Sequence, residues 1–130
     1  MIIRLEQSSE QPLYLQIREQ VIAAIATGEL AVGEALPSVR SLACDLSINL
    51  HTVNKAYAVL RDEGYLLMRG RSGAFVADPE SHTMQGRGAV EDARMAQELY
   101  ALALAHRARG GSEAEFKDAA AQQAVRAFSE

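Results

Sequence analysis

The chain has 130 residues, of which 48% are hydrophobic, and its formal net charge is −4. Its length suits one compact domain with a small appendage, and its apolar content is too high for a disordered chain. The single cysteine excludes an internal disulfide, and the absence of an apolar run of about twenty residues argues against an exported or membrane-spanning protein. The acidic total also counts against a nucleic-acid-binding protein, unless the basic residues are concentrated in one segment.

The first 36 residues are predicted to form a short strand, a helix and a second short strand. Met1–Leu5 has a β-like pattern of apolar residues. Pro12 suits the first position of a helix, because its missing N–H costs nothing there. The helix ends at Gly28, and its apolar residues recur at helical spacing: Tyr14, Ile17, Val21, Ile22 and Ile25. Gly33–Leu36 supplies the second strand, which is expected to pair with a later hairpin.

Two short amphipathic helices are predicted between Pro37 and Gly64. Ser38 and Asn49 are good N-caps for them, and Gly64 supplies a C-terminal stop. The buried faces have the i, i+3, i+4, i+7 spacing, with Val39, Leu42, Ala43 and Leu46 in the first helix and Val53, Ala56, Tyr57 and Leu60 in the second. Such a pair forms a helix-turn-helix, whose second helix projects one face into a DNA major groove.

The face that the apolar stripe leaves over carries residues able to contact DNA. Asn49 stands at its tip, and the face itself comprises Leu50, His51, Thr52, Asn54 and Lys55. Asn and His hydrogen-bond base edges, Thr contacts a methyl group or a phosphate, and Lys contacts phosphate or guanine. Arg40 lies on the solvent side of the preceding helix. The alternative is that these residues are merely solvated polar faces.

The next segment favours the DNA-binding interpretation. Leu66–Met68 and Ala74–Val76 are predicted strands, and Arg69–Gly73 is the tip between them. The glycines allow positive φ, and Arg69 and Arg71 stand where a wing meets phosphate or the minor groove. Residues 38–73 carry five basic and three acidic side chains, so the net charge of this segment is +2. The acidic balance of the chain therefore lies mostly outside it.

The ordered segments LPSVRSLA, TVNKAYAVLRDEGYL and RSGAFV resemble the DNA-binding domain of the GntR family of bacterial transcription regulators. The resemblance covers roughly Pro12–Ala77. The opening MIIRL followed by QPLYLQI resembles the YtrA-like subfamily, whose members have short C-terminal regions. Family members often have Pro or Arg at Leu50, Asn or Thr at His51 and Gly at Arg71, so an operator sequence is not transferable.

The resemblance implies DNA contacts from Ser38 and Arg40, from the start of the second helix and from the wing. Together with the residues derived above, the predicted DNA-binding set is Ser38, Arg40, Asn49, Leu50, His51, Thr52, Asn54, Lys55, Arg69, Gly70, Arg71 and Gly73.

The remaining chain is predicted to be a helical hairpin that forms a homodimer. Residues 1–78 are assigned to the winged helix-turn-helix, 79–88 to a linker and 89–130 to the hairpin. The first helix of the hairpin is predicted at Ala89–Arg109, and the second begins after a capping box formed by Ser112 and Glu115. Two helices cannot bury their apolar stripe against each other alone. The predicted interface is Met95, Leu99, Tyr100, Leu102, Phe116, Ala120 and Phe128. The alternative is that the hairpin packs back on its own winged domain.

The predicted fold is therefore α+β, mostly α, with an N-terminal winged helix-turn-helix and a C-terminal dimerisation hairpin. The predicted function is a sequence-specific transcription regulator, a repressor that binds a palindromic operator as a homodimer in the bacterial cytoplasm, associated with the nucleoid. The alternative function is a winged-helix module that binds protein without reading DNA. An enzyme or a metal site is not expected, because His51, His82 and His106 are far apart and Cys44 has no metal-spaced partner. No cofactor is expected.

The resemblance also implies regulation by an effector. Because the C-terminal region is short, the resemblance implies either that an effector binds a small pocket at the dimer interface or that the regulator is controlled without a metabolite domain. Any such pocket is expected to be lined by Met95, Leu99, Tyr100 and Phe116.

Overall fold

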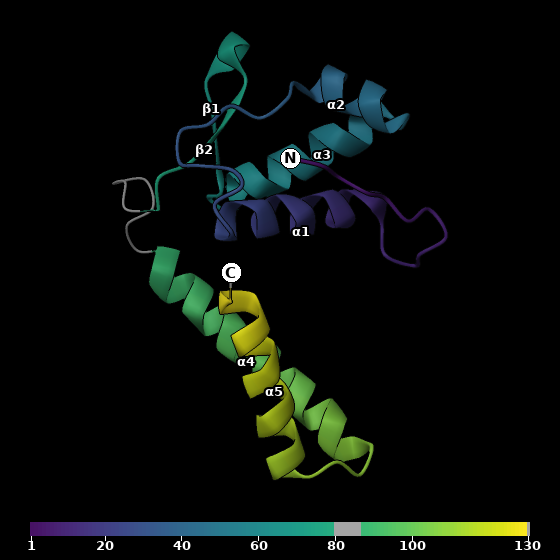
Figure 1. The fold of residues 1–130 in the computed structure, drawn as a ribbon, viewed down its shortest axis with the longest axis vertical. Helices are drawn as coiled ribbons and strands as arrows, with labels where there is room; N and C mark the ends of the chain where they lie inside the picture. Colours follow the sequence, from purple (N-terminus) through teal and green to yellow (C-terminus); the bar gives the residue numbers. More distant parts are fainter. Residues whose placement is uncertain (80–86, 130) are drawn as a thin grey trace. The chain divides into compact units, whose positions relative to one another are not determined.

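The computed structural model describes residues 1–79 and 87–129, and the chain divides into two compact units, Met1–Gln85 and Gly86–Glu130 (Figure 1). The first unit contains α1 (Leu13–Ala26), α2 (Val39–Leu46), α3 (Leu50–Asp62), β1 (Leu66–Met68), a 3-10 turn η1 (Gly70–Ser72) and β2 (Ala74–Val76). The second contains α4 (Arg87–Ala108) and α5 (Glu113–Phe128). The predicted class is confirmed: the fold is mainly helical, with a winged helix-turn-helix followed by a helical hairpin.

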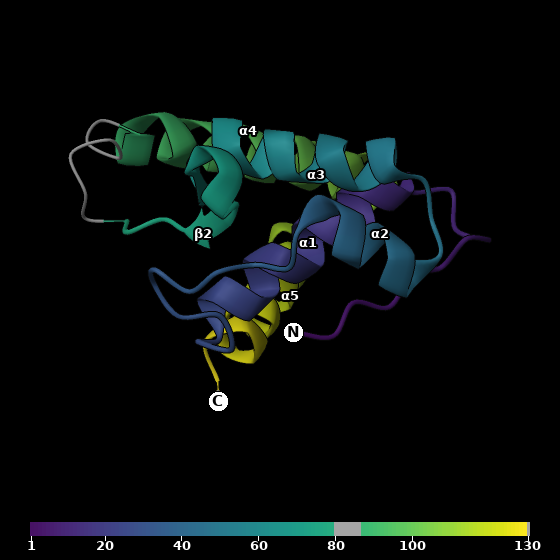
Figure 2. The same ribbon diagram turned by 90° about the horizontal axis from the view of Figure 1, so that it is seen from above.

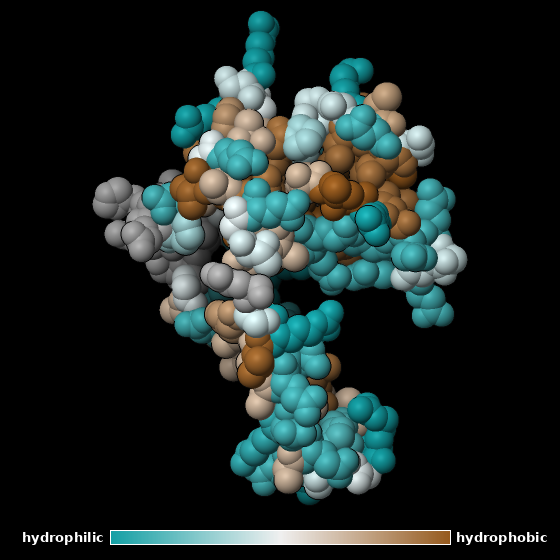
Figure 3. All heavy atoms as spheres, viewed as in Figure 1, coloured by the Kyte–Doolittle hydropathy of each residue, from teal (hydrophilic) through white to brown (hydrophobic). Residues whose placement is uncertain are grey.

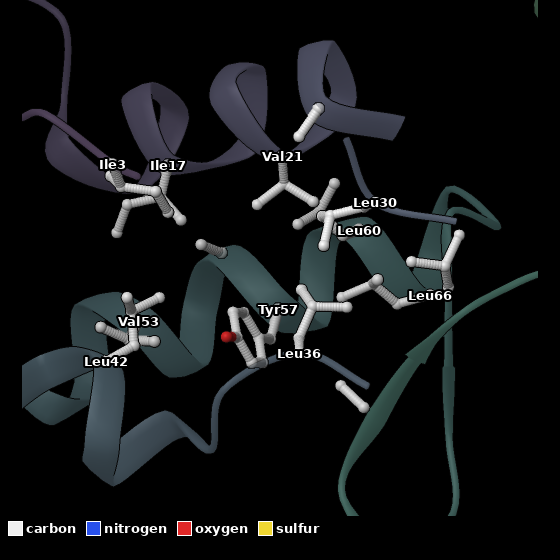
Figure 4. Packing of buried hydrophobic residues seen from close by; sticks show 14 of the residues in the cluster. Ile3, Ile17, Val21, Leu30, Leu36, Leu42, Val53, Tyr57, Leu60 and Leu66 are labelled. Atoms are coloured by element: carbon white, nitrogen blue, oxygen red, sulfur yellow. The ribbon is translucent and has the colours of Figure 1, made fainter. Parts of the chain in front are cut away.

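The core of the first unit lies between α1 and α3. Ile17 and Val21 of α1 point toward α3, where Val53 and Leu60 are likewise completely buried (Figure 4). These residues are those whose helical spacing predicted a buried face. Apolar burial on this scale contributes about 1.5–3 kcal/mol for each large side chain, so it fixes α3 firmly against its support.

The wing is a two-stranded antiparallel hairpin in which Leu66 pairs with Val76 and Met68 with Ala74. The predicted strand at Gly33–Leu36 is reduced to one bridge, between Ala35 and Phe75. Three backbone hydrogen bonds of 2.9 Å reinforce it: the Leu36 N–H donates to the Ala74 carbonyl oxygen, the Gly33 N–H donates to that of Val76, and the Val76 N–H donates to that of Glu34. The base of the wing is therefore attached to the chain that leads into α2.

The predicted N-terminal strand is wrong. Met1–Leu5 pairs with no strand in the part of the chain that the structure describes, and two glutamine side chains of α1 bind the backbone of residues 4 and 6 instead. The Gln20 amide accepts from the Arg4 N–H at 2.8 Å and donates to the Arg4 carbonyl oxygen at 2.7 Å. Gln16, which is buried, binds the backbone of Glu6 in the same two-sided way. An amide side chain satisfies the groups that a neighbouring strand would have paired.

The second unit is a hairpin of α4 and α5. The Ser112 capping box is confirmed, because its hydroxyl oxygen accepts from the Glu115 N–H at 3.1 Å and the Glu115 carboxylate accepts from the Ser112 N–H. The α4 helix begins at Arg87, so the last two residues of the predicted linker 79–88 are helical, whereas residues 80–86 lie outside the described part. None of the described helices has the length and apolarity to cross a membrane.

Candidate nucleic-acid interface

The first part of the interface is the N-terminal end of α2. The Ser38 hydroxyl oxygen accepts a hydrogen bond from the Ser41 N–H at 3.0 Å and so caps the helix, as its position in the sequence predicted. Its hydroxyl hydrogen is left for an acceptor outside the helix. Arg40 stands two residues further on and is exposed. This helix end therefore presents one neutral donor and one guanidinium group to solvent.

The second part is the N-terminal end of α3. Asn49 caps this helix, since its Oδ1 atom accepts from the His51 N–H at 2.8 Å. His51 and Asn54 are exposed and Thr52 is half-buried. Leu50 differs from them, because it is half-buried and packs partly against the core cluster. Its DNA contact, carried over from the family resemblance, remains a prediction.

The turn between α2 and α3 has a left-handed residue that is not a glycine. Ser47 has φ of 54° and ψ of 45°, and the Ile48 N–H donates to the Ala43 carbonyl oxygen at 3.0 Å. These bonds close the end of α2 and reverse the chain within three residues. The N-terminal end of α3 is consequently set close to α2 rather than on a free loop.

The wing tip is the third part. Arg69 and Arg71 are exposed, and the Arg69 guanidinium lies over the Phe75 ring at 5.3 Å from its centroid. Gly70 and Gly73 have φ of 56° and 94°, in the region that favours glycine. In Figure 1 the tip and α2 project from the same side of α3, away from α1, and Figure 3 shows hydrophilic residues at the tip.

Two carboxylates at the C-terminal end of α3 are paired with arginines. Glu63 at the end of α3 accepts from the Arg18 Nε–H at 2.9 Å, and that carboxylate raises the pKa of Arg18. Asp62 pairs with Arg61 at 3.1 Å. Arg40, Arg69 and Arg71 are all exposed, and none of them forms a salt bridge with a carboxylate among the described residues, so their charges remain available to a ligand.

Lys55 is exposed, and its Nζ lies over the Tyr14 ring of α1, 4.1 Å from the ring centroid. The sequence places Lys55 on the polar side of α3 but does not reveal this contact. Tyr14 has the helical spacing of a core or interface residue. Its aromatic ring at the start of α1 was the only signal in the sequence that could have indicated the contact with Lys55.

The predicted dimer-interface residues lie on the second unit, where most of them are exposed. Phe128 is 90% exposed and Tyr100 and Leu102 are each 60% exposed, whereas Phe116 is half-buried. Figure 3 shows hydrophobic residues among hydrophilic ones on this hairpin. Met95, Leu99 and Ala120 are exposed as well. A surface of this kind is typical of an unpartnered interaction face.

A hollow of about 390 Å³ lies at the turn between α4 and α5. Tyr100 and Phe116 line it, whereas Met95 and Leu99 do not. The His106 imidazole lies beside Phe116, with ring centroids 6.0 Å apart, and its Nε2 atom is buried without a hydrogen-bond partner among the described residues. The pocket expected at a dimer interface remains a prediction, because this hollow lies within one protomer at the end of the hairpin.

Comparison with known proteins identifies the family. The family model for bacterial regulatory proteins of the gntR family matches residues 13–76. The HTH-type transcriptional regulator Rv1152 of Mycobacterium tuberculosis is 37% identical over 84 residues, which are 63% of this chain and 69% of the relative. The chain belongs to the gntR family. Because the family consists of regulatory proteins, this gntR-family chain is a transcription regulator and not an enzyme.

Another relative agrees with the predicted YtrA-like subfamily. The HTH-type transcriptional repressor YtrA of Bacillus subtilis is 36% identical over 84 residues, which are 64% of this chain and 64% of the relative. The match to the longer regulator TauR of Rhodobacter capsulatus is 39% identical but spans only 15% of that protein. The similarity therefore spans about two thirds of the shorter relatives and a small part of the longer one.

Solved structures support the same fold. YtrA from Sulfolobus acidocaldarius, a GntR-family transcription factor, superposes with a TM-score of 0.58 at 40% identity, over 73% of this chain and 99% of that one. A transcriptional antiterminator from Listeria monocytogenes covers 100% of this chain and 95% of its own, with a TM-score of 0.85 at 22% identity, which shows the fold alone. The AraR DNA-binding domain, solved with operator ORX1, has a TM-score of 0.51 at 28% identity, over 57% of this chain and 92% of its own.

Proposed function

We propose that this gntR-family regulator reads a specific operator sequence and represses transcription by occluding a promoter. The observation that carries the proposal is the joint exposure of two capped helix ends and a basic wing on one unit. Asn49, His51, Thr52 and Asn54 would read bases, and Arg40, Lys55, Arg69 and Arg71 would contact the backbone. The structure of the AraR domain with its operator and the name of the YtrA repressor support both parts of the proposal.

The sequence preference can be measured by selection from random DNA duplexes with the purified chain. We expect enrichment of an inverted repeat, with half-sites about one helical turn apart, and nuclease protection over that repeat. The absence of any enrichment at moderate salt would refute sequence-specific binding. In that case, the alternative of a winged-helix protein-interaction module, which the net charge of −4 favours, would be preferred.

The proposal includes a homodimer formed through residues 89–129. Two copies would cover the exposed apolar residues of the hairpin and would present two DNA-binding units, which matches a two-fold operator. Burial of one leucine contributes about 1.5–3 kcal/mol, so Leu99→Glu should weaken dimerisation at least about tenfold. Gln97→Glu, an exposed polar position on the same helix, is the matched control. Light scattering over a dilution series tests this, and a wild-type monomer at all concentrations would refute it.

The proposal further places this regulator in the cytoplasm, associated with the nucleoid. It also includes a small-molecule effector that binds at the hairpin. The hollow beside His106 has the volume of a small ligand site, since such sites start at about 300 Å³. An effector acts by preferring one spacing or angle of the two DNA-binding units. Operator release by one compound in a metabolite screen would support this, and a screen without release would favour control without a metabolite.

A further inference from the structure

The contact between Tyr14 and Lys55 joins the first turn of α1 to the second turn of α3. A distance of 4.1 Å from the Lys55 Nζ to the ring centroid is well within the range of a cation–π contact. The side chain of a lysine otherwise has four freely rotating bonds and loses much rotamer entropy when it is ordered. The ring therefore orders a side chain that would otherwise be mobile.

Tyr14 can contact the Lys55 ammonium group because only part of its ring packs against the core. It packs against the core cluster but is half-buried, whereas Ile17 and Val21 of the same helix are completely buried. Lys55 is exposed and remains accessible to a ligand. One part of the ring thus contacts the core while another part is left for the ammonium group.

The position of the contact between Tyr14 and Lys55 favours the binding of an anion. The N-terminal ends of α1 and α3 lie at the same end of the unit in Figures 1 and 2. At the start of α1, Pro12 makes no side-chain capping hydrogen bond, so the partial positive charge of the first turn is not offset by a cap. The Lys55 ammonium adds a full positive charge beside it. A DNA phosphate that passes the start of α3 would meet both.

We propose that Tyr14 is a positioning residue for DNA binding, whose ring holds the Lys55 ammonium beside the start of α1, where it contacts a backbone phosphate. The inference rests on the proposed function and adds to it a residue outside the helix-turn-helix and the wing. Tyr14 itself does not read bases. Its effect on affinity is exerted through Lys55.

The test is a double-mutant cycle on the full chain, with a fluorescent duplex that carries the sequence enriched in the selection above. Lys55→Met should weaken binding and reduce the slope of log affinity against log salt by about one for each subunit. Tyr14→Leu should weaken binding about two- to fivefold for each subunit in the wild-type background. It should have no further effect in the Lys55→Met background.

Two controls separate positioning from folding. Tyr14→Phe keeps the ring and should bind DNA as the wild type does, and Lys117→Met, at the chain's other lysine, should leave the salt slope unchanged. Equal losses from Tyr14→Leu in both backgrounds, or a Tyr14→Phe variant as weak as Tyr14→Leu, would overturn the inference. If the wild type itself bound no duplex selectively, the proposed function would fail instead. Thermal unfolding of each variant identifies losses that come from misfolding.

Discussion

The Tyr57 hydroxyl donates a hydrogen bond of 2.7 Å to the carbonyl oxygen of Pro37. Tyr57 is 1% exposed and lies in the middle of α3, whereas Pro37 directly precedes Ser38, the cap of α2. Figure 4 shows the ring between the helix and the chain near Leu36. The start of α2 is therefore linked to the middle of α3 by this hydrogen bond as well as by apolar packing.

Tyr57→Phe should lower the free energy of unfolding by about 1 kcal/mol, since it removes one hydrogen bond but keeps the ring. Burial also raises the pKa of Tyr57 well above its usual value of 10.0. Ionisation is then favoured in the unfolded chain, so the contribution of Tyr57 is complete below about pH 10 and is lost as the pH rises further. Urea denaturation at increasing pH measures this. Identical pH slopes for the wild type and Tyr57→Phe would contradict the prediction.

Arg40→Ala should reduce operator binding by about 1–3 kcal/mol, as expected for a side chain that contacts a base or phosphate. Arg40 is exposed at the start of α2, so the variant should fold normally. Fluorescence anisotropy at one fixed salt concentration measures the affinity, because salt alone changes it strongly. Arg126→Ala, an exposed arginine of α5, is the control. Equal affinities of the Arg40 and Arg126 variants would exclude the assigned role.

The two wing glycines should respond differently to alanine. Gly73 has φ of 94° and ψ of −155°, a region almost restricted to glycine, where another residue costs about 1–3 kcal/mol. Gly70 has φ of 56°, which other residues adopt at a smaller cost. Gly73→Ala should therefore distort the tip and weaken DNA binding more than Gly70→Ala does. DNA affinity and circular dichroism spectra of both variants test this prediction. A larger loss of affinity for Gly70→Ala than for Gly73→Ala would refute it.

Gly111→Ala should destabilise the hairpin of α4 and α5. A methyl group at Gly111 would overlap the His106 imidazole, which would have to leave its place beside Phe116. The melting temperature should fall. In a His106→Ala background the same change should be neutral or slightly stabilising, because alanine restricts the unfolded chain. Thermal unfolding of the wild type, the two single variants and the double variant measures the coupling between positions 106 and 111. Additive effects on the melting temperature would show that the imidazole is not what excludes a methyl group at position 111.

Features that depend on local sequence were predicted well. The N-caps Ser38, Asn49 and Ser112 and the apolar spacing of α2 and α3 were assigned correctly, because capping and helical periodicity involve residues within one or two turns. The hairpin of β1 and β2 was predicted for the same reason, with its glycines at the tip.

Of the features that join distant segments, the pairing of Gly33–Leu36 with the wing was predicted, but the contacts of α1 were not. The N-terminal strand was wrong because glutamines of α1, 10 and 16 residues away from the backbone groups they bind, replaced a strand partner. Both the contact between Lys55 and Tyr14 and the ion pair between Arg18 and Glu63 depend on the packing of α1 against α3. Periodicity shows which face of a helix is buried, but it does not show which residues meet across the contact.

The Asn49 cap has a consequence for the bases that this residue can recognise. Its Oδ1 atom accepts from the His51 N–H, which occupies one of its two lone pairs, whereas the amide NH₂ group keeps both hydrogens to donate. The paired contact of an asparagine with adenine needs both amide atoms, one as acceptor and one as donor. The cap therefore favours acceptors such as guanine O6 and N7 or a phosphate oxygen as partners of Asn49. Asn54, one turn into α3 and exposed, is the side chain suited to adenine.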